Sequence, residues 1–296
     1  MYAEAARRIE SRSRDSSRGY SLAMNRWGDF TEEEFRVFML PSSLPGRKRP
    51  QRPADAAGKR LKELSDIRPA LPSTLDWRGT GAVSAIKDQA TCGSCWAYGV
   101  TSAVESSYYM MTGNPVNLSE QQLVDCAWDT GNEGCDGGLQ DMGLVYLMAI
   151  SPAGGLMPED SYAYQGQDMY CQERASPGNV RVKGYGYVKP WCKECLQSAL
   201  FLSGPLSISI DANTEDFRFY KSGIYYSPDC GSAEEDLDHA VTLVGYVPDP
   251  NHVGHVAWIV KNSWSTYWGN DGFILISSFN NTCGVMTQPV YAEVQV

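Results

Sequence analysis

The residues best suited to covalent chemistry lie in one short stretch, residues 89–98, which reads QATCGSCWAY. Within it, Cys95 stands at the beginning of an expected helix that ends near Met111. Unpaired N–H groups and the positive end of the helix dipole favour a thiolate over a thiol at such a position. A thiolate is the nucleophile that covalent acyl transfer needs, provided that a base and an orienting group lie nearby.

The chain has three histidines that are candidates for that base. His239 opens a β-rich run, which is a rigid place from which to present an imidazole. His252 and His255 lie in the polar stretch PDPNHVGH at 248–255, where a surface loop is expected. Asn262 follows in KNSW, and its amide can fix the orientation of an imidazole. The tryptophans after it would keep water from that hydrogen bond.

The elements that must position these side chains change type along the chain. Helical spacing of apolar residues predicts helices over 96–111, from Ser119 through Val124 with a capping box, and over 139–150. Runs rich in β-forming residues predict strands at 205–210, 240–247, 256–260 and 272–277. A helical half followed by a β half predicts an α+β fold with a cleft between two lobes.

Composition and charge narrow the functional class. The 296 residues are 43% hydrophobic and 20% charged, as in globular proteins, and no apolar run is long enough to span a membrane. Nine cysteines favour an oxidising compartment. Residues 1–70 carry a net charge of +5 and residues 71–296 a net charge of −15. The acidic part argues against nucleic acid and anionic membranes as partners, and it matches the basic N-terminal part electrostatically.

Taken together, the motifs resemble the papain family of cysteine proteases. CGSCWAY fits the nucleophile signature of papain and the cathepsins, and DHAV and KNSW…WG follow in the family's order. NPVNLSEQQLVDC at 114–126 and GCDGG at 134–138 also resemble family blocks. The resemblance implies a papain-like two-lobe fold over 71–296, with an active-site cleft between the lobes. The helical lobe is expected mainly at 71–180 and the β-barrel-like lobe mainly at 181–296.

By position, the resemblance implies four catalytic roles. Cys95 is the nucleophile, His239 is the general base and then the acid, and Asn262 orients the imidazole. Gln89 stabilises the oxyanion together with the backbone N–H of Cys95. No metal and no organic cofactor is required. Ser265 stands where the family usually has glycine.

The resemblance also implies a cleft for protein and peptide substrates, with specificity set mainly by the residue two before the scissile bond. The expected binding residues are Gly137, Gly138, Leu139, Ser209, Leu237, Asp238, Trp264 and Gln288. Leu139 and Leu237 offer apolar surface, so Leu, Val or Phe is expected in this pocket. Gln288 is uncharged and cannot form an ion pair with Arg. No His-rich insert between Gly138 and Tyr170 caps the cleft, so internal cleavage is expected.

The remaining cysteines are implied to form a disulfide framework. By analogy, the pairs are Cys92 with Cys135, Cys126 with Cys171, and Cys230 with Cys283. Cys95 is then spared, as a nucleophile must be. Cys192 and Cys195 remain as either a local bridge or free thiols.

The N-terminal region resembles part of a propeptide. GYSLAMNRWGDFTEEEF at 19–35 is similar to the end of the inhibitory propeptide of cathepsin L-like enzymes. Residues 1–40 are therefore expected to be a partial inhibitory propeptide, with residues 6–14 as the tail of its long helix. Residues 41–70 are expected to be a linker with activation cleavage sites, at Arg47, Lys48, Arg49, Lys59 and Arg60. The alternative is a structural subdomain that never leaves.

The favoured hypothesis is a cysteine endopeptidase made as a zymogen, with its own propeptide and cystatin-like proteins as inhibitors. Sequons at Asn117 and Asn280, with the disulfides, favour a lysosomal, vacuolar or secreted location, although no secretory signal is visible in this sequence. The rival is a catalytically silent papain-fold binding or scaffold protein. CGSC could alternatively be a thioredoxin-like redox pair or, with Cys192 and Cys195, a zinc site. The absence of a βαβ pattern and the long gap between the two pairs oppose these alternatives.

Overall fold

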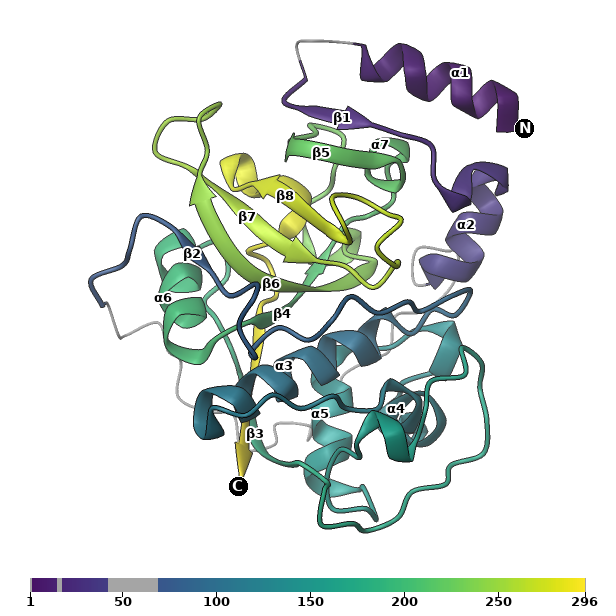
Figure 1. The fold of residues 1–296 in the computed structure, drawn as a ribbon, viewed down its shortest axis with the longest axis vertical. Coiled ribbons are helices and arrows are strands. Elements are labelled where there is room, and N and C mark those ends of the chain that lie inside the picture. The colour runs from purple at the N-terminus through teal and green to yellow at the C-terminus, as the bar shows by residue number, and fades with distance from the viewer. Residues whose placement is uncertain (1, 15–17, 42–68, 296) are drawn as a thin grey trace.

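The computed structural model describes residues 2–14, 18–41 and 69–295 (Figure 1). Its helices are α1 (Tyr2–Ser13), α2 (Glu32–Met39), α3 (Cys95–Thr112), α4 (Glu120–Cys126), α5 (Gln140–Ala149), α6 (Lys193–Ser203) and α7 (Glu215–Arg218). Its strands are β1 (Tyr20–Leu22), β2 (Leu75–Asp76), β3 (Arg181–Tyr187), β4 (Leu206–Ile210), β5 (Tyr220–Tyr225), β6 (His239–Pro248), β7 (Val256–Lys261), β8 (Phe273–Ser277) and β9 (Val290–Gln295). The cleavage sites expected in the linker lie outside the described residues.

The helical lobe is built around α3, which runs between the sheet and the pair α4 and α5 in Figure 1. The three helices predicted from apolar spacing are all present. Helix α3 ends at Gly113, whose φ of +72° is the left-handed conformation that glycine adopts without strain. Helix α4 begins where Ser119 accepts a hydrogen bond from the backbone of Gln122 at 3.0 Å. Trp96, at the start of α3, is fully buried in this lobe's core.

The strands form one open sheet in the order β1-β5-β8-β7-β6-β4-β9-β3, with β2 paired to β6, so the sheet does not close into a barrel. The four predicted strand runs are β4, β6, β7 and β8. On β4, Leu206, Ile208 and Ile210 are all buried in the main core. The terminal pair β3 and β9 packs instead into the core of α3 and α5, so the later part of the chain also contributes to the helical lobe.

The N-terminal segment is described at residues 2–14 and 18–41, and its elements α1 and β1 lie beside β5 and α7 at one edge of the sheet (Figure 1). Strand β1 extends the sheet by pairing antiparallel with β5, with Tyr20 opposite Gly223. Helix α2 starts with a capping box between Thr31 and Glu34. No helix within the described ranges is long and apolar enough to cross a membrane.

The cysteines form four disulfides. They join Cys92 to Cys135, Cys126 to Cys171, Cys230 to Cys283, and Cys192 to Cys195. The first three are the pairs implied by the family resemblance, and the fourth resolves the open choice between a bridge and free thiols. Cys95 is the one free cysteine. Because the four cysteines of the zinc alternative are now three bonded sulfurs and one free thiol, that alternative and a redox bridge within CGSC are both wrong.

Candidate active site

The helical side of the site consists of Cys95, the first residue of α3, and Gln89 in the preceding loop. Gln89 is completely buried, and its Nε2 donates to the carbonyl of Cys92 at 2.9 Å. Its Oε1 accepts from Ser263 Oγ at 2.7 Å, so the amide is fixed from two directions. An amide nitrogen carries two hydrogens. The second hydrogen of Nε2 is therefore available for an oxyanion formed beside Cys95.

The sheet side consists of His239, the first residue of β6, and Asn262, which directly follows β7. These strands pair antiparallel, and His239 Nε2 lies 2.8 Å from Asn262 Oδ1. That oxygen also accepts from the backbone N–H of Ser263, so it is the carbonyl oxygen of the amide. A carbonyl oxygen only accepts, so Nε2 carries the imidazole proton. Nδ1 is then unprotonated and buried, and it has no hydrogen-bond partner among the residues that the structure describes, as a base waiting for a proton would be.

Trp264 holds this pair in place. Its ring lies 4.7 Å from the imidazole of His239, at 33° to it, and the side chain is fully buried. Ser265, next in the chain, has a φ of +66°, the left-handed region that glycine prefers. The local turn therefore explains why glycine is usual at this position in the family, and here a serine adopts the same conformation.

The two sides meet in one cleft. Its lining includes Cys95, His239 and most of the residues expected to bind substrate, namely Gly138, Leu139, Ser209, Leu237, Asp238 and Gln288. Of the other expected binding residues, Gly137 precedes Gly138 with a φ of +113°, and Trp264 lies behind His239. Neither of these two is part of the lining.

The expectation of a thiolate at Cys95 is wrong for this covered state. Burial raises the pKa of Cys95 to about 11, although hydrogen bonding from the backbones of Ala240, Trp96 and Cys95 itself opposes the shift. Burial also lowers the pKa of His239 to about 4, against the hydrogen bond with Asn262. Near neutral pH both groups are therefore uncharged. The helix start does favour the thiolate, but the loss of solvent outweighs it.

The N-terminal segment packs next to the start of α3. Met39 and Leu40 are completely buried, and Pro41 packs so closely on Gly93 that a Cβ there would lie 2.3 Å from Pro41 Cγ and 2.5 Å from the carbonyl oxygen of Cys135. Any side chain at position 93 would therefore force Pro41 or the Cys135 backbone to move. The segment thus contacts the stretch just before the nucleophile.

Aromatic side chains anchor the same segment on the sheet side. The rings of Trp27 and Phe35 lie 6.4 and 5.4 Å from that of Trp264. Arg218, from α7, donates to the backbone carbonyls of Trp27 and of Phe30, the latter at 2.7 Å. No motif in the sequence indicated that Trp27 and Phe35 would contact Trp264.

Ion pairs add to the anchoring, as the opposite charges of the two regions suggested. Arg12 contacts Glu215 at 2.6 Å and Asp216 at 2.8 Å, and Arg8 contacts Glu215 at 2.5 Å. Arg26 pairs with Asp88 in the loop next to Gln89. The basic residues of the N-terminal segment therefore pair with carboxylates on α7 and with Asp88 in the loop next to Gln89.

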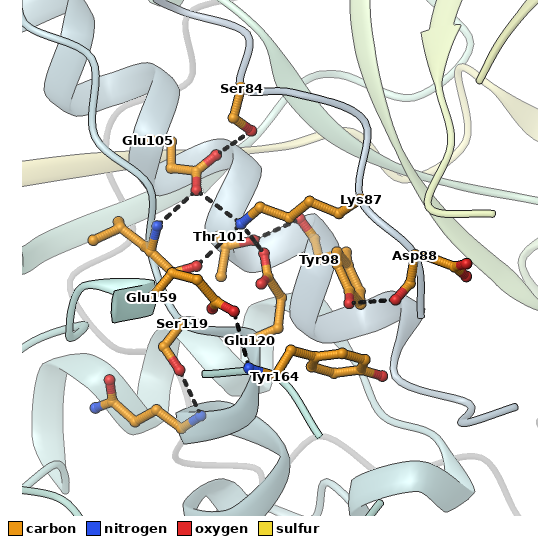
Figure 2. A network of polar contacts seen from close by, with 12 residues as sticks. Ser84, Lys87, Asp88, Tyr98, Thr101, Glu105, Ser119, Glu120, Glu159 and Tyr164 are labelled. Atoms are coloured by element: carbon orange, nitrogen blue, oxygen red, sulfur yellow. Dashed lines mark hydrogen bonds and ion pairs between the residues drawn. The ribbon is translucent and has the colours of Figure 1, made fainter. Parts of the chain in front are cut away.

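A buried polar network supports the helical side and was not foreseen from the sequence. Figure 2 shows Lys87, two residues before Gln89, at its centre. Lys87 Nζ donates to Glu120 Oε1 at 2.6 Å and to Glu105 Oε1 at 3.2 Å, and Thr101 Oγ1 also donates to Glu120, at 2.6 Å. The network joins the loop before Cys95 to α3 and α4. Only the proximity of Lys87 to Gln89 could have pointed to it, because its carboxylates are distant in sequence.

Ser263 and Tyr164 are further supporting residues that the sequence did not reveal. Ser263 bonds the Gln89 side chain, and its carbonyl accepts from the Gln89 backbone at 2.9 Å. Tyr164 Oη donates to the Gln89 carbonyl at 2.9 Å. Within the described residues, no group of three histidine, cysteine or acidic side chains is placed to hold a metal ion.

This chain is similar to known proteins both in sequence and in structure. A family model described as papain family cysteine protease matches residues 71–293. A cathepsin L-like peptidase of Aedes aegypti is 40% identical over 277 residues, covering 92% of this chain and 78% of that protein. Cathepsin L2 of Homo sapiens is 40% identical over 278 residues, covering 93% and 79%. The solved structure of digestive procathepsin L 3 from Tenebrio molitor larval midgut matches with a TM-score of 0.84 and 33% identity, covering 99% of this chain and 88% of that one.

Proposed function

Because this chain belongs to the papain family of cysteine proteases and resembles the cathepsin L zymogens, we propose that Cys95, His239, Asn262 and Gln89 carry out its peptide hydrolysis. The observation that carries the proposal is the fixed tautomer of His239. Its Nε2 donates to Asn262 at 2.8 Å, so Nδ1 is the free lone pair on the ring in the cleft that Cys95 also lines.

The proposed reaction starts when the N-terminal segment leaves and water enters the cleft. The pKa of Cys95 then falls and that of His239 rises, since burial was the main cause of both shifts. The thiol proton moves to His239 Nδ1, and the thiolate attacks the peptide carbonyl carbon. The resulting oxyanion accepts hydrogen bonds from Gln89 Nε2 and the backbone N–H of Cys95.

The second half of the reaction returns the site to its starting state. His239 gives its proton to the leaving amine, the C–N bond breaks, and a thioester to Cys95 remains. His239 then takes a proton from water, whose oxygen attacks the thioester carbonyl. The C–S bond breaks, and the carboxylic acid product leaves with the thiolate restored. Asn262 keeps the imidazole in one orientation throughout.

The same proposal assigns the parts of the chain. Residues 1–40 act as a partial inhibitory propeptide, 41–70 as the linker that is cut, and 71–296 as the peptidase domain. The ion pairs and aromatic contacts of the N-terminal segment support this division. Cystatin-like proteins are the expected external inhibitors. A lysosomal, vacuolar or secreted location fits the four disulfides.

For specificity, we propose that the enzyme cleaves internal peptide bonds and prefers a bulky apolar residue at the second position before the scissile bond. Leu139 and Leu237 line the cleft beside Cys95, and Gln288 adds a polar, uncharged group. Each buried methylene favours binding by about 0.8 kcal/mol. A peptide library should therefore select Leu, Val or Phe over Arg and Lys at that position. Preference for a basic residue, or stepwise release of dipeptides, would contradict this part of the proposal.

An active-site thiol probe separates this enzyme from a silent papain-fold scaffold. After the N-terminal segment has been removed, an electrophilic peptide should label one residue, Cys95, and labelling should abolish peptide hydrolysis. Cys95→Ala should neither label nor hydrolyse, with an unchanged circular dichroism spectrum. Cys92 and Cys135 serve as an internal control, because their bond keeps them unlabelled. A rate of peptide hydrolysis by Cys95→Ala within tenfold of the wild-type rate would show that Cys95 is not the nucleophile.

A further inference from the structure

A second Cys-x-x-Cys motif lies outside the cleft, at the start of α6. Cys192 and Cys195 are joined across a sequence separation of 3, with Lys193 and Glu194 between them. Cys192 is the N-cap of this 11-residue helix, and the backbone N–H of Cys195 donates to its sulfur at 3.2 Å. The catalytic proposal makes no use of this pair.

The two sulfurs differ in their surroundings. The side chain of Cys195 is only 5% exposed and belongs to the main core, whereas Cys192 is partly exposed at the edge of that core. Lys193 follows Cys192 in the sequence, but its Nζ bonds the carbonyl of Gly254 at 2.6 Å and pairs with Glu194 at 3.5 Å. The position of Cys192 at the N-terminus of α6 favours a thiolate. An incoming thiolate can therefore reach Cys192, and Cys192 is the sulfur better suited to bear a charge after reduction.

The fold depends less on this disulfide than on the others. The other three bonds span sequence separations of 43, 45 and 53, so they restrict the unfolded chain far more than a bond across 3 residues. Helix α6 is also held independently, because Leu196, Ala199 and Leu200 are buried in the main core. Opening the Cys192–Cys195 bond leaves these contacts in place.

We propose that Cys192 and Cys195 form a reversible thiol–disulfide exchange site for dithiols, separate from Cys95 and functional in the folded protein. One thiolate of the dithiol attacks Cys192 Sγ, the bond to Cys195 breaks, and Cys195 leaves as a thiolate that takes up a proton. The second thiolate of the dithiol then attacks its own sulfur in the mixed disulfide and releases Cys192. The dithiol is oxidised to a disulfide, and the protein pair gains the two electrons.

The main test is a reduction series on the full chain carrying Cys95→Ala, which removes the one free thiol. The folded protein is equilibrated with increasing dithiothreitol near neutral pH, quenched with acid and alkylated, and each cysteine is quantified by mass spectrometry. Cys192 and Cys195 should become reduced at a dithiothreitol concentration at least about 10-fold lower than any other pair, with the circular dichroism spectrum unchanged. Oxidised dithiothreitol should restore the bond.

Two results of this series would overturn the proposal. One is reduction of another pair before, or together with, Cys192 and Cys195. Here Cys126–Cys171 is the sharpest internal control, because Cys171 is exposed and exposure alone would make that bond react first. The other is reduction of Cys192 and Cys195 only where the folded spectrum is lost.

A matched pair of variants tests the predicted asymmetry. In the Cys95→Ala background, Cys195→Ser leaves only the Cys192 thiol at this site, and Cys192→Ser leaves only the Cys195 thiol. Iodoacetamide should alkylate Cys192 about 10-fold faster than Cys195 near neutral pH, because Cys192 is accessible and its thiolate is stabilised. Equal rates, or faster reaction of Cys195, would contradict the mechanism. Should a single variant not fold, the reduction series decides the question alone.

Discussion

The two walls of the cleft hold their functional side chains by different forces. The helical wall, residues 84–120, fixes its part of the site through charges and hydrogen bonds around Lys87 (Figure 2). The sheet wall, formed by β6, β7 and residues 262–268, fixes His239 and Asn262 by aromatic packing. There Trp264 lies within 6 Å of the rings of both Phe217 and Trp268.

The N-terminal segment meets the two walls unequally. It adds the buried rings of Trp27 and Phe35 to the aromatic cluster of the sheet wall. On the helical wall its contacts are the half-exposed ion pair of Arg26 with Asp88 and the packing of Pro41 on Gly93. Removing the segment therefore leaves the polar network intact but opens one side of the aromatic cluster. The sheet wall is therefore the side of the site that loses packing contacts when the segment is absent.

Trp27→Ala should give the largest change if the aromatic contacts dominate. Trp27 is 2% exposed, and truncating such a side chain costs about 3–5 kcal/mol, or at least about 100-fold in the population of the open site. Labelling of Cys95 by a thiol probe at pH 7, in the unprocessed chain, should accelerate accordingly. Val37→Ala is the matched control, since Val37 on the same segment is 43% exposed. Similar labelling rates for the two variants would show that the aromatic anchor is not what closes the site.

Gln89→Ala tests the helical wall directly. The loss of one oxyanion donor typically lowers kcat by about 100-fold or more, while leaving KM nearly unchanged. Steady-state kinetics of the processed enzyme on a Leu-containing peptide will show both parameters. Ser263→Ala removes only the partner of Gln89 Oε1, so it should reduce kcat by a smaller factor. A large rise in KM with unchanged kcat would place Gln89 in substrate binding instead.

Much of this arrangement could be predicted from the sequence, and the reasons are local. Apolar spacing identified α3, α4 and α5, and β-rich runs identified β4, β6, β7 and β8. Strand β3 was not predicted, because its sequence RVKGYGY contains two glycines and a lysine and its burial does not alternate. Helix α6 was not predicted either, since its N-cap is a disulfide-bonded cysteine.

The site residues that lie in a sequence motif could be predicted. The residues that only contacts between distant parts of the chain bring to the site could not. Cys95, His239, Asn262 and Gln89 each stand in a short, recognisable block. Glu105 and Glu120 have no such block, and only the fold brings them to Lys87. The raised pKa of Cys95 was not predicted, because it follows from the burial of this side chain in the folded protein and no local pattern shows that burial.

The polar network of the helical wall should show itself in the pH dependence of stability. Burial raises the pKa of Glu120 to about 7, against the charge of Lys87. The folded state therefore binds more protons than the unfolded state between the ordinary pKa of glutamate and about 7. Glu120 should consequently lower the free energy of unfolding as the pH rises through this window, by at most about 1.4 kcal/mol per pH unit, whereas His239, with its pKa lowered to about 4, raises it below the ordinary pKa of histidine.

Urea unfolding of the Cys95→Ala chain at pH 5, 6 and 7 measures the total slope, and Glu120→Gln should shift it in the positive direction by removing the negative contribution. Glu194→Gln is the control, because the Glu194 side chain is 62% exposed and should leave the slope as it is. An identical slope in all three chains would remove Glu120 as its source. A shift in the negative direction in Glu120→Gln would contradict the raised pKa of Glu120.

The smallest effect is expected from Arg26→Ala, where the segment meets the helical wall through a pair with side chains 35% and 37% exposed. Burial raises the pKa of Asp88, but the hydrogen bonds from Arg26 and from the Ala90 backbone outweigh it and hold the pKa below its ordinary value. The contribution of the pair is therefore complete above the ordinary pKa of aspartate and lost as the pH falls through the lowered one. At pH 6–7 the variant should label at Cys95 about 2- to 5-fold faster than the unprocessed wild type, as suits an exposed pair. As the pH falls through the lowered pKa of Asp88 the ratio should approach one, whereas the ratio for Trp27→Ala should stay large, since that contact carries no titrating group. A pH-independent ratio for Arg26→Ala would mean that this arginine acts through packing on the Trp27 ring, 4.3 Å away, and not through its charge.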